Sequence, residues 1–351
     1  MADSACRELI IKAIFICLLD LAFSYSFRSC IEIPDSNHTI FRCIKCHETD
    51  ITAIVSDVYP TATNLTVSRN NITHIQGQSF HHLFNLTSLV LDANHIASIH
   101  KDAFNNLQKL KMLNLSCNHI SSLHQVSAYA FSNTPHLTKL ELNINIIAYL
   151  DHKALSGLRH LVTLRLDNNL LSDIYNDTFE DLISLKTLNL RNNQIAVIFN
   201  YAFQNLSNLT TLDLGGNNIT QIRPHAFDGL KKLTELYLDR NRLKEIDSTL
   251  FGKLHATLQV LDLQANHILY FSEHTYSPFI NMSKLLDLKL DAQEPSGINL
   301  LPRAFFRGLT SLKSLYLTNN HIIGFGAETF DDLKSLEFLT LDNSSLSGTI
   351  L

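Results

Sequence analysis

The sequence predicts an α/β solenoid of stacked repeats, because one leucine pattern returns about twelve times along its 351 residues. The stretch "LVLDANHIASI" from Leu89 has close copies from Leu113, Leu261 and Leu315. An asparagine and a phenylalanine recur with the same period. These observations predict a horseshoe with short parallel strands on its concave face, and with loops and short helical turns on its convex face.

The repeat unit has the order L-x-x-L-x-L-x-x-N-x-I/L, as in Leu185, Leu188, Leu190, Asn193 and Ile195. Most units are 24 residues apart, one is 25 and three are 27. This is the leucine-rich-repeat pattern, and its L-x-L alternation predicts a short strand with one buried face. The units begin at Ala62, Leu86, Leu110, Leu137, Leu161, Leu185, Leu209, Leu233, Leu258, Leu285, Leu312 and Leu336.

The recurring asparagine follows each strand, where its amide can bond backbone groups that would otherwise be buried without a partner. We interpret this asparagine ladder as structural, since a binding site needs no such regularity. Its members are Asn70, Asn94, Asn118, Asn145, Asn169, Asn193, Asn217, Asn241, Asn266 and Asn320.

The recurring phenylalanine lies six residues before the next unit, and we interpret this phenylalanine ladder as core filling. Large rings would space the convex side more widely than the strands, which are about 4.8 Å apart, and so bend the stack. The members are Phe80, Phe104, Phe131, Phe179, Phe203, Phe227, Phe279, Phe306 and Phe330.

The tenth unit departs most from the pattern. Gln293 replaces the ladder asparagine, and Pro295 and Gly297 follow it. These turn residues predict a loop that leaves the regular surface, and such loops often carry function. Gln293 and Gly297 are therefore candidate ligand-binding residues, although a tolerated insertion explains the same residues.

The N-terminal region predicts a secreted chain. In residues 1–26, Arg7 and Lys12 accompany an apolar run too short to span a membrane, which indicates a cleaved signal peptide. Residues 27–61 form the expected cysteine-containing cap of the repeats. Its disulfide candidates are Cys30, Cys43 and Cys46, and we expect Cys30 to bond Cys43 or Cys46, although these cysteines together with Cys117 leave three pairings open.

The segment "CIKCH" at residues 43–47 also matches a haem attachment pattern, and zinc could use the same cysteines with His38 and His47. The disulfide-bonded cap accounts for these residues better, so no cofactor is predicted.

Residues 62–351 hold the repeats. The last unit has Ser344 where the asparagine belongs and no cysteine cluster after it. An open stack would leave an apolar core face in water, so the repeats are expected to be truncated at this end and the chain to be a fragment of a longer protein.

The 24-residue unit with F-x-x-L, as in "AFQNLSNLTTLDLGGNNITQI", resembles the ectodomain of vertebrate Toll-like receptors from Cys30 to the end. The segment "LKLDAQEPSG" is similar to the fish-rich branch of that family, which includes nucleic-acid sensors. The resemblance implies a glycoprotein of innate immunity that binds a microbial ligand and pairs as a homodimer. RNA is the first ligand expected, double-stranded RNA included. A protein or lipid ligand at the cell surface is the second.

The resemblance also implies parts beyond this chain. These are more repeats, a C-terminal cysteine cap, a membrane helix and a cytoplasmic Toll/interleukin-1-receptor signalling domain. The receptor would enter the secretory pathway and lie in the cell-surface or endosomal membrane, with its ectodomain outside the cell or in the lumen.

Eleven N-x-S/T sequons are candidate glycosylation sites. Asn114 lies between Leu113 and Leu115, so a glycan there would crowd the concave face and favour partners on a lateral face. The sequons are Asn37, Asn64, Asn71, Asn85, Asn114, Asn176, Asn205, Asn208, Asn218, Asn281 and Asn343.

Four histidines directly follow a ladder asparagine and are candidate ligand-binding residues: His95, His119, His267 and His321. Histidine charges at endosomal pH. The signal peptide contributes −1 of the net charge of −5, so the remainder carries −4, or +13 with all 17 histidines protonated. Such a surface could bind phosphate in acid. Solvated positions that tolerate histidine are the alternative.

Nothing in the sequence indicates an enzyme, because it has no phosphate loop, G-x-S-x-G or H-E-x-x-H motif. Outward cations near the strands alternate with aspartates, which indicates a mixed solvated face; they are Arg165, Arg191, Arg240 and Lys289 with Asp167, Asp213, Asp239 and Asp262. The rival interpretation is a secreted or cell-surface leucine-rich-repeat protein of adhesion or matrix, and the sequence after Leu351 in the parent transcript would distinguish the two.

Overall fold

The computed structural model describes residues 31–35, 38–44, 46–121, 131–150, 153–246, 249–268, 277–295 and 297–344. The predicted signal peptide, Cys30 and Asn37 lie outside these residues. The chain forms two compact units. Unit 1 comprises Met1–Ser172 and Asp177–Leu188, and unit 2 comprises Asp173–Asn176 and Asn189–Leu351.

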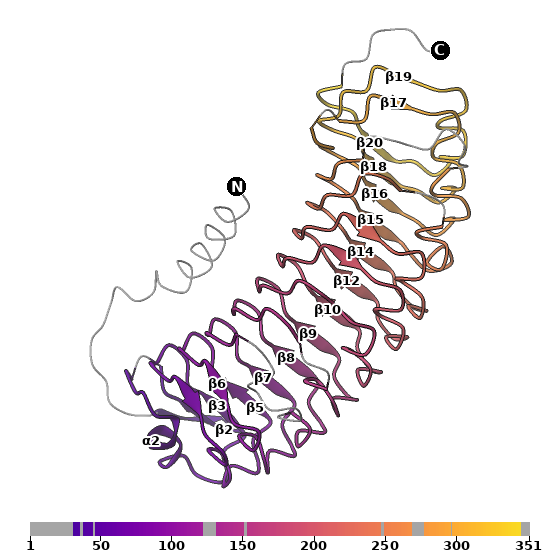
Figure 1. Ribbon diagram of the computed structural model, residues 1–351. Helices are drawn as coiled ribbons and strands as arrows, with labels where there is room; N and C mark the ends of the chain where they lie inside the picture. Colours follow the sequence, from indigo (N-terminus) through magenta and orange to yellow (C-terminus); the bar gives the residue numbers. More distant parts are fainter. Residues whose placement is uncertain are drawn as a thin grey trace. The chain divides into compact units, whose positions relative to one another are not determined.

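Unit 1 is a parallel-strand solenoid (Figure 1). It begins with an antiparallel strand pair. Strand β1 (Ile31–Asp35) pairs antiparallel with β2 (His38–Arg42), and β2 pairs in parallel with the first repeat strand. The repeat strands follow in chain order as β3 (Asn64–Thr66), β5 (Ser88–Val90), β7 (Met112–Asn114), β8 (Lys139–Glu141) and β9 (Thr163–Arg165).

Unit 2 is built in the same way, and the boundary between the units runs through β10 (Thr187–Asn189). Its neighbouring strands are again parallel and again follow chain order. They are β12 (Thr211–Asp213), β14 (Glu235–Tyr237), β15 (Val260–Asp262), β16 (Asp287–Lys289), β18 (Ser314–Tyr316) and β20 (Phe338–Thr340). The predicted fold class of a parallel-strand leucine-rich-repeat solenoid is thus confirmed.

The strand register explains the leucine pattern. In unit 1 the central leucines pair turn by turn, Leu65 with Leu89 and Leu89 with Leu113. In unit 2 Leu236 pairs with Leu261 in the same way. These side chains are buried, whereas both flanking residues of most strands are half-buried. One face of each strand therefore enters the core, and the other, which we call the strand face, stays accessible.

The asparagine ladder satisfies backbone groups of two successive turns. Nδ2 of Asn94 donates to the carbonyl oxygens of Val67 at 2.8 Å, Leu91 at 3.0 Å and Asp92 at 3.2 Å. Its Oδ1 accepts from the amide of Ile72 at 3.4 Å. The other ladder asparagines are also buried and make equivalent bonds to backbone carbonyls in both units. These hydrogen bonds agree with the predicted structural role of the ladder.

The phenylalanine ladder lies in the core as stacked rings. Ring centroids of Phe80 and Phe104 are 6.1 Å apart with planes at 11°, and those of Phe203 and Phe227 are 6.4 Å apart at 10°. All four rings are buried. The rings therefore fill the core, as their spacing predicts.

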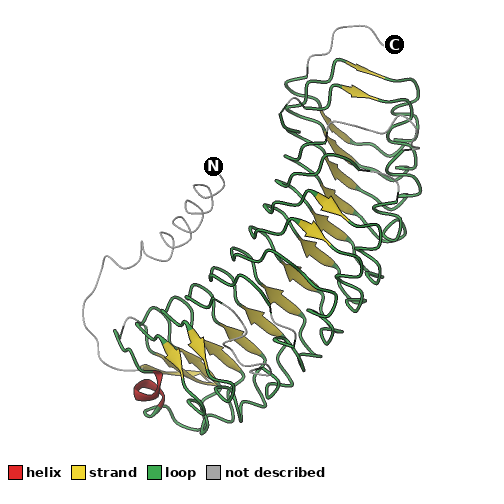
Figure 2. Cartoon of the chain, viewed as in Figure 1, coloured by secondary structure: helices red, strands yellow, loops and turns green. Residues whose placement is uncertain are grey.

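The side opposite the strands, which we call the turn side, consists of turns and two-residue strands (Figure 2). These short strands pair as β4 (His74–Ile75) with β6 (Ser98–Ile99), β11 (Val197–Ile198) with β13 (Gln221–Ile222), and β17 (Leu300–Leu301) with β19 (Gly324–Phe325). Among the described residues the one α-helix is α2 (Ile51–Val55), which lies in the cap. Single turns on this side are closed by backbone bonds between residues three apart, such as that from the amide of Leu83 to the carbonyl of Phe80 at 2.9 Å, so the turns are short and the described chain contains little helix.

Helix α2 begins at Asp50, whose Oδ1 accepts from the amide of Thr52 at 2.9 Å. Nε2 of His82 lies 3.2 Å from the carbonyl oxygens of both Val55 and Val58, which connects the helix to the repeats. The described residues contain no helix long and apolar enough to cross a membrane.

The disulfide of the cap joins a different pair of cysteines from the pair that we expected. Cys43 is bonded to Cys46, so neither is bonded to Cys30 as we expected. The chain turns directly after β2 and brings their Cα atoms within 6.1 Å, a separation that a disulfide spans.

Candidate functional site

Three of the four candidate histidines are exposed, as their position predicts. His95, His119 and His321 lie at the surface directly after a buried ladder asparagine. The backbone of His95 is fixed by a 2.9 Å bond from its amide to the carbonyl of Ile72 on the preceding turn. The asparagine thus faces the core while the next residue faces solvent.

His267 departs from this pattern, because it is half-buried. Its Nδ1 is shielded from solvent and has no hydrogen-bond partner among the described residues. His267 therefore presents less of its ring to a phosphate than the three exposed histidines do.

In unit 1 the structure brings His95 and His119 together. Their ring centroids are 5.1 Å apart with planes at 34°. Burial lowers the pKa of His119, and the charge of His95 lowers it further. Two adjacent imidazoles resist double protonation, so this pair gains less charge in mild acid than two separate histidines would.

Gln293 is a core residue and not a ligand-binding residue exposed on a loop. It is 3% exposed, and its Nε2 donates to the carbonyls of Leu263 at 2.8 Å and Leu290 at 3.3 Å. Its Oε1 accepts from the amide of Ile268 at 3.1 Å. Glutamine therefore makes the bonds of a ladder asparagine, and the expected interruption of the ladder does not occur.

Gly297 is likewise packed inside unit 2. Its φ is +70°, and a Cβ there would lie 2.6 Å from the amide nitrogen of His321 and 2.9 Å from Cα of Asn320. The residue is glycine because the next turn passes too close for any side chain. Its selection as a ligand-binding residue finds no support in these contacts.

The strand face of unit 2 carries a network of carboxylates around three cations, of which the exposed Arg240 has its Nε 3.9 Å from Oδ2 of Asp239. Nη1 of Arg191 lies 3.2 Å from Asp213, and its Nη2 lies 2.5 Å from Asp239, two turns further along. Gly215 occupies the turn between, where a Cβ would overlap the guanidinium. Nζ of Lys289 lies 3.3 Å from Asp262. Asp239 and Asp262 are buried whereas the side chain of Arg240 is 70% exposed, so the predicted mixture of charges is present but only part of it is solvated.

Burial changes the acidity of this network. It raises the pKa of Asp213, Asp262, Asp287 and Asp291, in each case as the largest cause. It also raises the pKa of Tyr237 to about 12. Oδ1 of Asp287 is buried without a hydrogen-bond partner among the described residues. Asp213, Glu235, Asp239, Asp262, Asp287 and Asp291 nevertheless outnumber the cations Arg191, Arg240 and Lys289 on this face, so we expect it to disfavour polyanions where these carboxyls are ionised.

The sequence analysis did not identify three acidic residues of this network, Glu235, Asp287 and Asp291. Glu235 and Asp287 are outward residues of β14 and β16, so the alternation of each strand was the signal that could have identified them. Their shared environment arises only from the pairing of distant turns.

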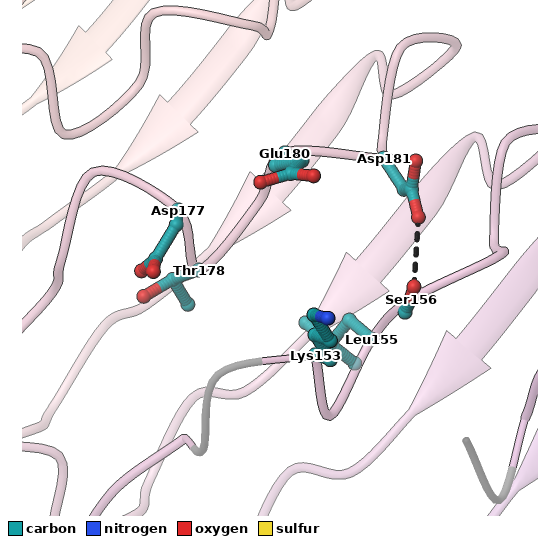
Figure 3. A pocket seen from close by; sticks show the side chains of 7 residues that line it. All are labelled: Lys153, Leu155, Ser156, Asp177, Thr178, Glu180 and Asp181. Carbon is teal, nitrogen blue, oxygen red and sulfur yellow. Dashed lines mark hydrogen bonds between the residues drawn. The ribbon is translucent and has the colours of Figure 1, made fainter. Parts of the chain in front are cut away.

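A hollow on the turn side of unit 1 is too small for an organic ligand. Figure 3 shows its lining residues, Lys153, Leu155, Ser156, Asp177, Thr178, Glu180 and Asp181. Oδ2 of Asp181 accepts from the hydroxyl of Ser156 and the amide of Gly157, both at 2.9 Å. The enclosed volume of about 10 Å³ admits about one water molecule. No cluster of His, Cys, Asp and Glu in the described chain could hold a metal ion.

The sequons occupy different surfaces. Asn114 lies on the accessible side of β7, and its Oδ1 accepts from the amide of Ser116 at 2.9 Å. Asn71 and Asn218 directly follow a ladder asparagine, the same position as the candidate histidines. Asn176, Asn205, Asn281 and Asn343 are exposed, and Asn64, Asn85 and Asn208 are half-buried. Glycan occupancy at these residues stays a prediction.

The repeats of this chain match a known protein family. The family model of the leucine-rich repeat matches residues 84–133, 135–195, 183–243 and 295–346, more than half of the chain. No curated protein matches the sequence.

Two solved structures are similar. The crystal structure of a TLR13–ssRNA13 complex is 29% identical with a TM-score of 0.76, over 84% of this chain and 43% of that chain. This chain thus spans less than half of the length of that protein. A leucine-rich-repeat protein of Leptospira interrogans is 24% identical with a TM-score of 0.66, over 82% of this chain and 68% of that chain, and shows the fold alone.

Proposed function

Because the chain belongs to the leucine-rich-repeat family, we propose that it is the binding part of an innate immune receptor of the Toll-like type, and that its ligand is RNA. Leucine-rich-repeat solenoids are typically non-enzymatic binding scaffolds, since stacked turns present an extended surface. Two receptor chains that bind one RNA would come close together, and this proximity would start signalling.

The observation that carries the proposal is the similarity to the TLR13–ssRNA13 complex. That similarity extends over 84% of this chain, and the ligand in the complex is an RNA. The membrane anchor, the signalling domain and the homodimer belong to the proposal as well, as does location in the secretory pathway and then in the cell-surface or endosomal membrane.

The electrostatics favour some surfaces over others. Phosphate would avoid the carboxylates on the strand face of unit 2. It would meet cationic groups more readily where His95, His119 and His321 are exposed, once acid has protonated them. Binding is therefore expected to strengthen in acid even though the pKa of His119 is lowered.

The test is RNA affinity at about pH 5.5 and pH 7.4 across a series of salt concentrations. Affinity should rise in acid, and the salt dependence should steepen as more phosphates are neutralised. The triple substitution His95→Gln, His119→Gln and His321→Gln should reduce the acid effect, while His255→Gln, at an exposed histidine outside this set, should leave it unchanged. Absence of RNA binding at both pH values would refute the proposed ligand.

A further inference from the structure

An exposed pair of stacked rings lies on the turn side of unit 2. The ring centroids of Tyr201 and His225 are 5.6 Å apart with planes at 10°. Tyr201 is 42% exposed and the side chain of His225 is 52% exposed. The amide of Tyr201 donates to the carbonyl of His225 at 2.9 Å. The repeat thus aligns the two rings because they occupy the same position of successive turns.

A second exposed pair lies next to the first. Phe199, 39% exposed, directly follows β11, and the exposed Arg223 directly follows β13. Ile198 and Ile222 are paired in the two strands, and the amide of Arg223 donates to the carbonyl of Ile198 at 2.9 Å. An exposed apolar ring and an exposed guanidinium therefore lie two residues before Tyr201 and His225, respectively, along the chain.

A hollow of about 240 Å³ lies beside Asp228, a residue that contacts His225. Asp228, Gly229, Leu230, Lys231 and Lys253 line it. Nδ1 of His225 lies 3.2 Å from Oδ2 of Asp228, which connects the ring stack to the hollow. Both lysines are exposed, and the one carboxylate among the lining residues is already engaged with His225.

We propose that Phe199, Tyr201, Arg223, His225, Lys231 and Lys253, here called the turn-side surface, bind single-stranded RNA. This inference rests on the proposed function and names the form of RNA and the place of contact. Unpaired bases stack on exposed aromatic rings whatever their sequence, and neighbouring cations hold the phosphates. Paired bases expose no face for stacking, so a duplex would lose this contribution.

The charges of unit 2 favour this surface over its strand face. Among the turn-side surface and the residues that line the hollow, the cations Arg223, Lys231 and Lys253 accompany one carboxylate, Asp228, whereas the strand face carries more carboxylates than cations. The sequons Asn205 and Asn208 lie on the preceding turn, and Oδ1 of Asn208 accepts from Nζ of Lys232 at 2.7 Å. A glycan there would compete with RNA, so binding is measured after the glycans have been trimmed to one sugar.

The experiment compares variants of the full chain with single-stranded and duplex RNA of equal length. Tyr201→Ala should lower affinity for single-stranded RNA about tenfold, and Tyr201→Phe should restore it because the ring remains. The matched control is Tyr149→Ala, which removes a tyrosine that is 50% exposed in unit 1. In a single-stranded RNA that contains 2-aminopurine, binding to the wild type should quench the fluorescence of this base by stacking. Binding to Tyr201→Ala should quench it less.

The double substitution Lys231→Ala with Lys253→Ala should weaken binding and reduce the salt slope by about 1.4, since each phosphate contact contributes about 0.7. If the wild type binds single-stranded RNA and neither Tyr201→Ala nor the lysine substitutions weaken it, the turn-side surface is wrong while the proposed function stands. Equal losses for duplex and single strand would exclude stacking. A wild type that binds no RNA would overturn the proposed function itself.

Discussion

Each ladder asparagine connects two turns through one side chain. Asn94 bonds the carbonyls of Val67, Leu91 and Asp92 and accepts from the amide of Ile72. The stacking of turns buries the bonds to Val67, Leu91 and Ile72 and partly buries the bond to Asp92. Loss of the amide would leave several buried groups without partners, which costs more than the bonds contribute in isolation.

We therefore expect Asn94→Ala to lower the free energy of unfolding by about 2–4 kcal/mol. The adjacent His95→Ala removes an exposed side chain and should change it by less than about 0.5 kcal/mol. Urea denaturation of both variants measures the difference. Equal effects from the two substitutions would contradict the structural role of the ladder.

His119 has a pH dependence of its own. Burial and His95 lower its pKa from the ordinary 6.5, so the folded chain resists a proton that the unfolded chain accepts. This stability is present above pH 6.5 and is lost as the pH falls through the lowered pKa. His95→Gln should raise the pKa of His119 towards 6.5, as followed by NMR titration of its ring proton. An unchanged pKa would mean that His95 has no influence.

Gln293 and Gly297 show how far single residues can be interpreted from the sequence. Both depart from the repeat, and a departure indicates function and packing equally well. The neighbouring turns distinguish packing from function at both positions. Gln293 bonds the carbonyl of Leu263, and the backbone of Asn320 leaves no room for a side chain at position 297. The leucine and asparagine positions were predictable because each is repeated many times and each has one physical explanation.

At the scale of the element, the strand face of unit 2 concentrates carboxylates because parallel strands in register place equivalent outward residues side by side. Asp262 on β15 and Lys289 on β16 are one such neighbouring pair. The alternation of a strand predicts which residues point outward. It does not predict that Arg191 crosses Gly215 to reach Asp239, since that contact depends on the absence of a side chain in the turn between.

Burial, together with the charge of Asp262, raises the pKa of Asp287, while Lys289 lowers it. A raised pKa means that stability is present below the unfolded value and is lost as the pH rises through the folded value. Asp287→Asn should therefore stabilise the chain at pH 7, by roughly 1 kcal/mol or less, and have little effect near pH 3. Thermal unfolding at both pH values measures this.

The matched control is Asp331→Asn, because Asp331 is an exposed aspartate of the same unit. It should leave stability unchanged at both pH values. A loss of stability on Asp287→Asn at pH 7 would contradict the prediction that burial destabilises the ionised carboxylate of Asp287.

At the scale of the whole molecule, each turn contacts mainly the turns before and after it, so its stability depends on near neighbours. Asn217 bonds Leu190 and Leu214 within unit 2. Asn217→Ala should accelerate hydrogen exchange in the turns around it and leave the turns around Leu89 in unit 1 unchanged. Asn94→Ala should give the reverse pattern. Uniform acceleration along the chain would indicate one cooperative unit instead.

The repeated register has a consequence for how such chains diversify. Leu236 pairs with Leu261 across 25 residues and Leu261 with Leu288 across 27, yet both pairs keep the same alignment. The surplus residues leave the ladder intact, so gene duplication or unequal recombination can add, lengthen or delete a whole turn without shifting the others. New recognition surfaces can then arise on inserted turns while the older turns keep their geometry.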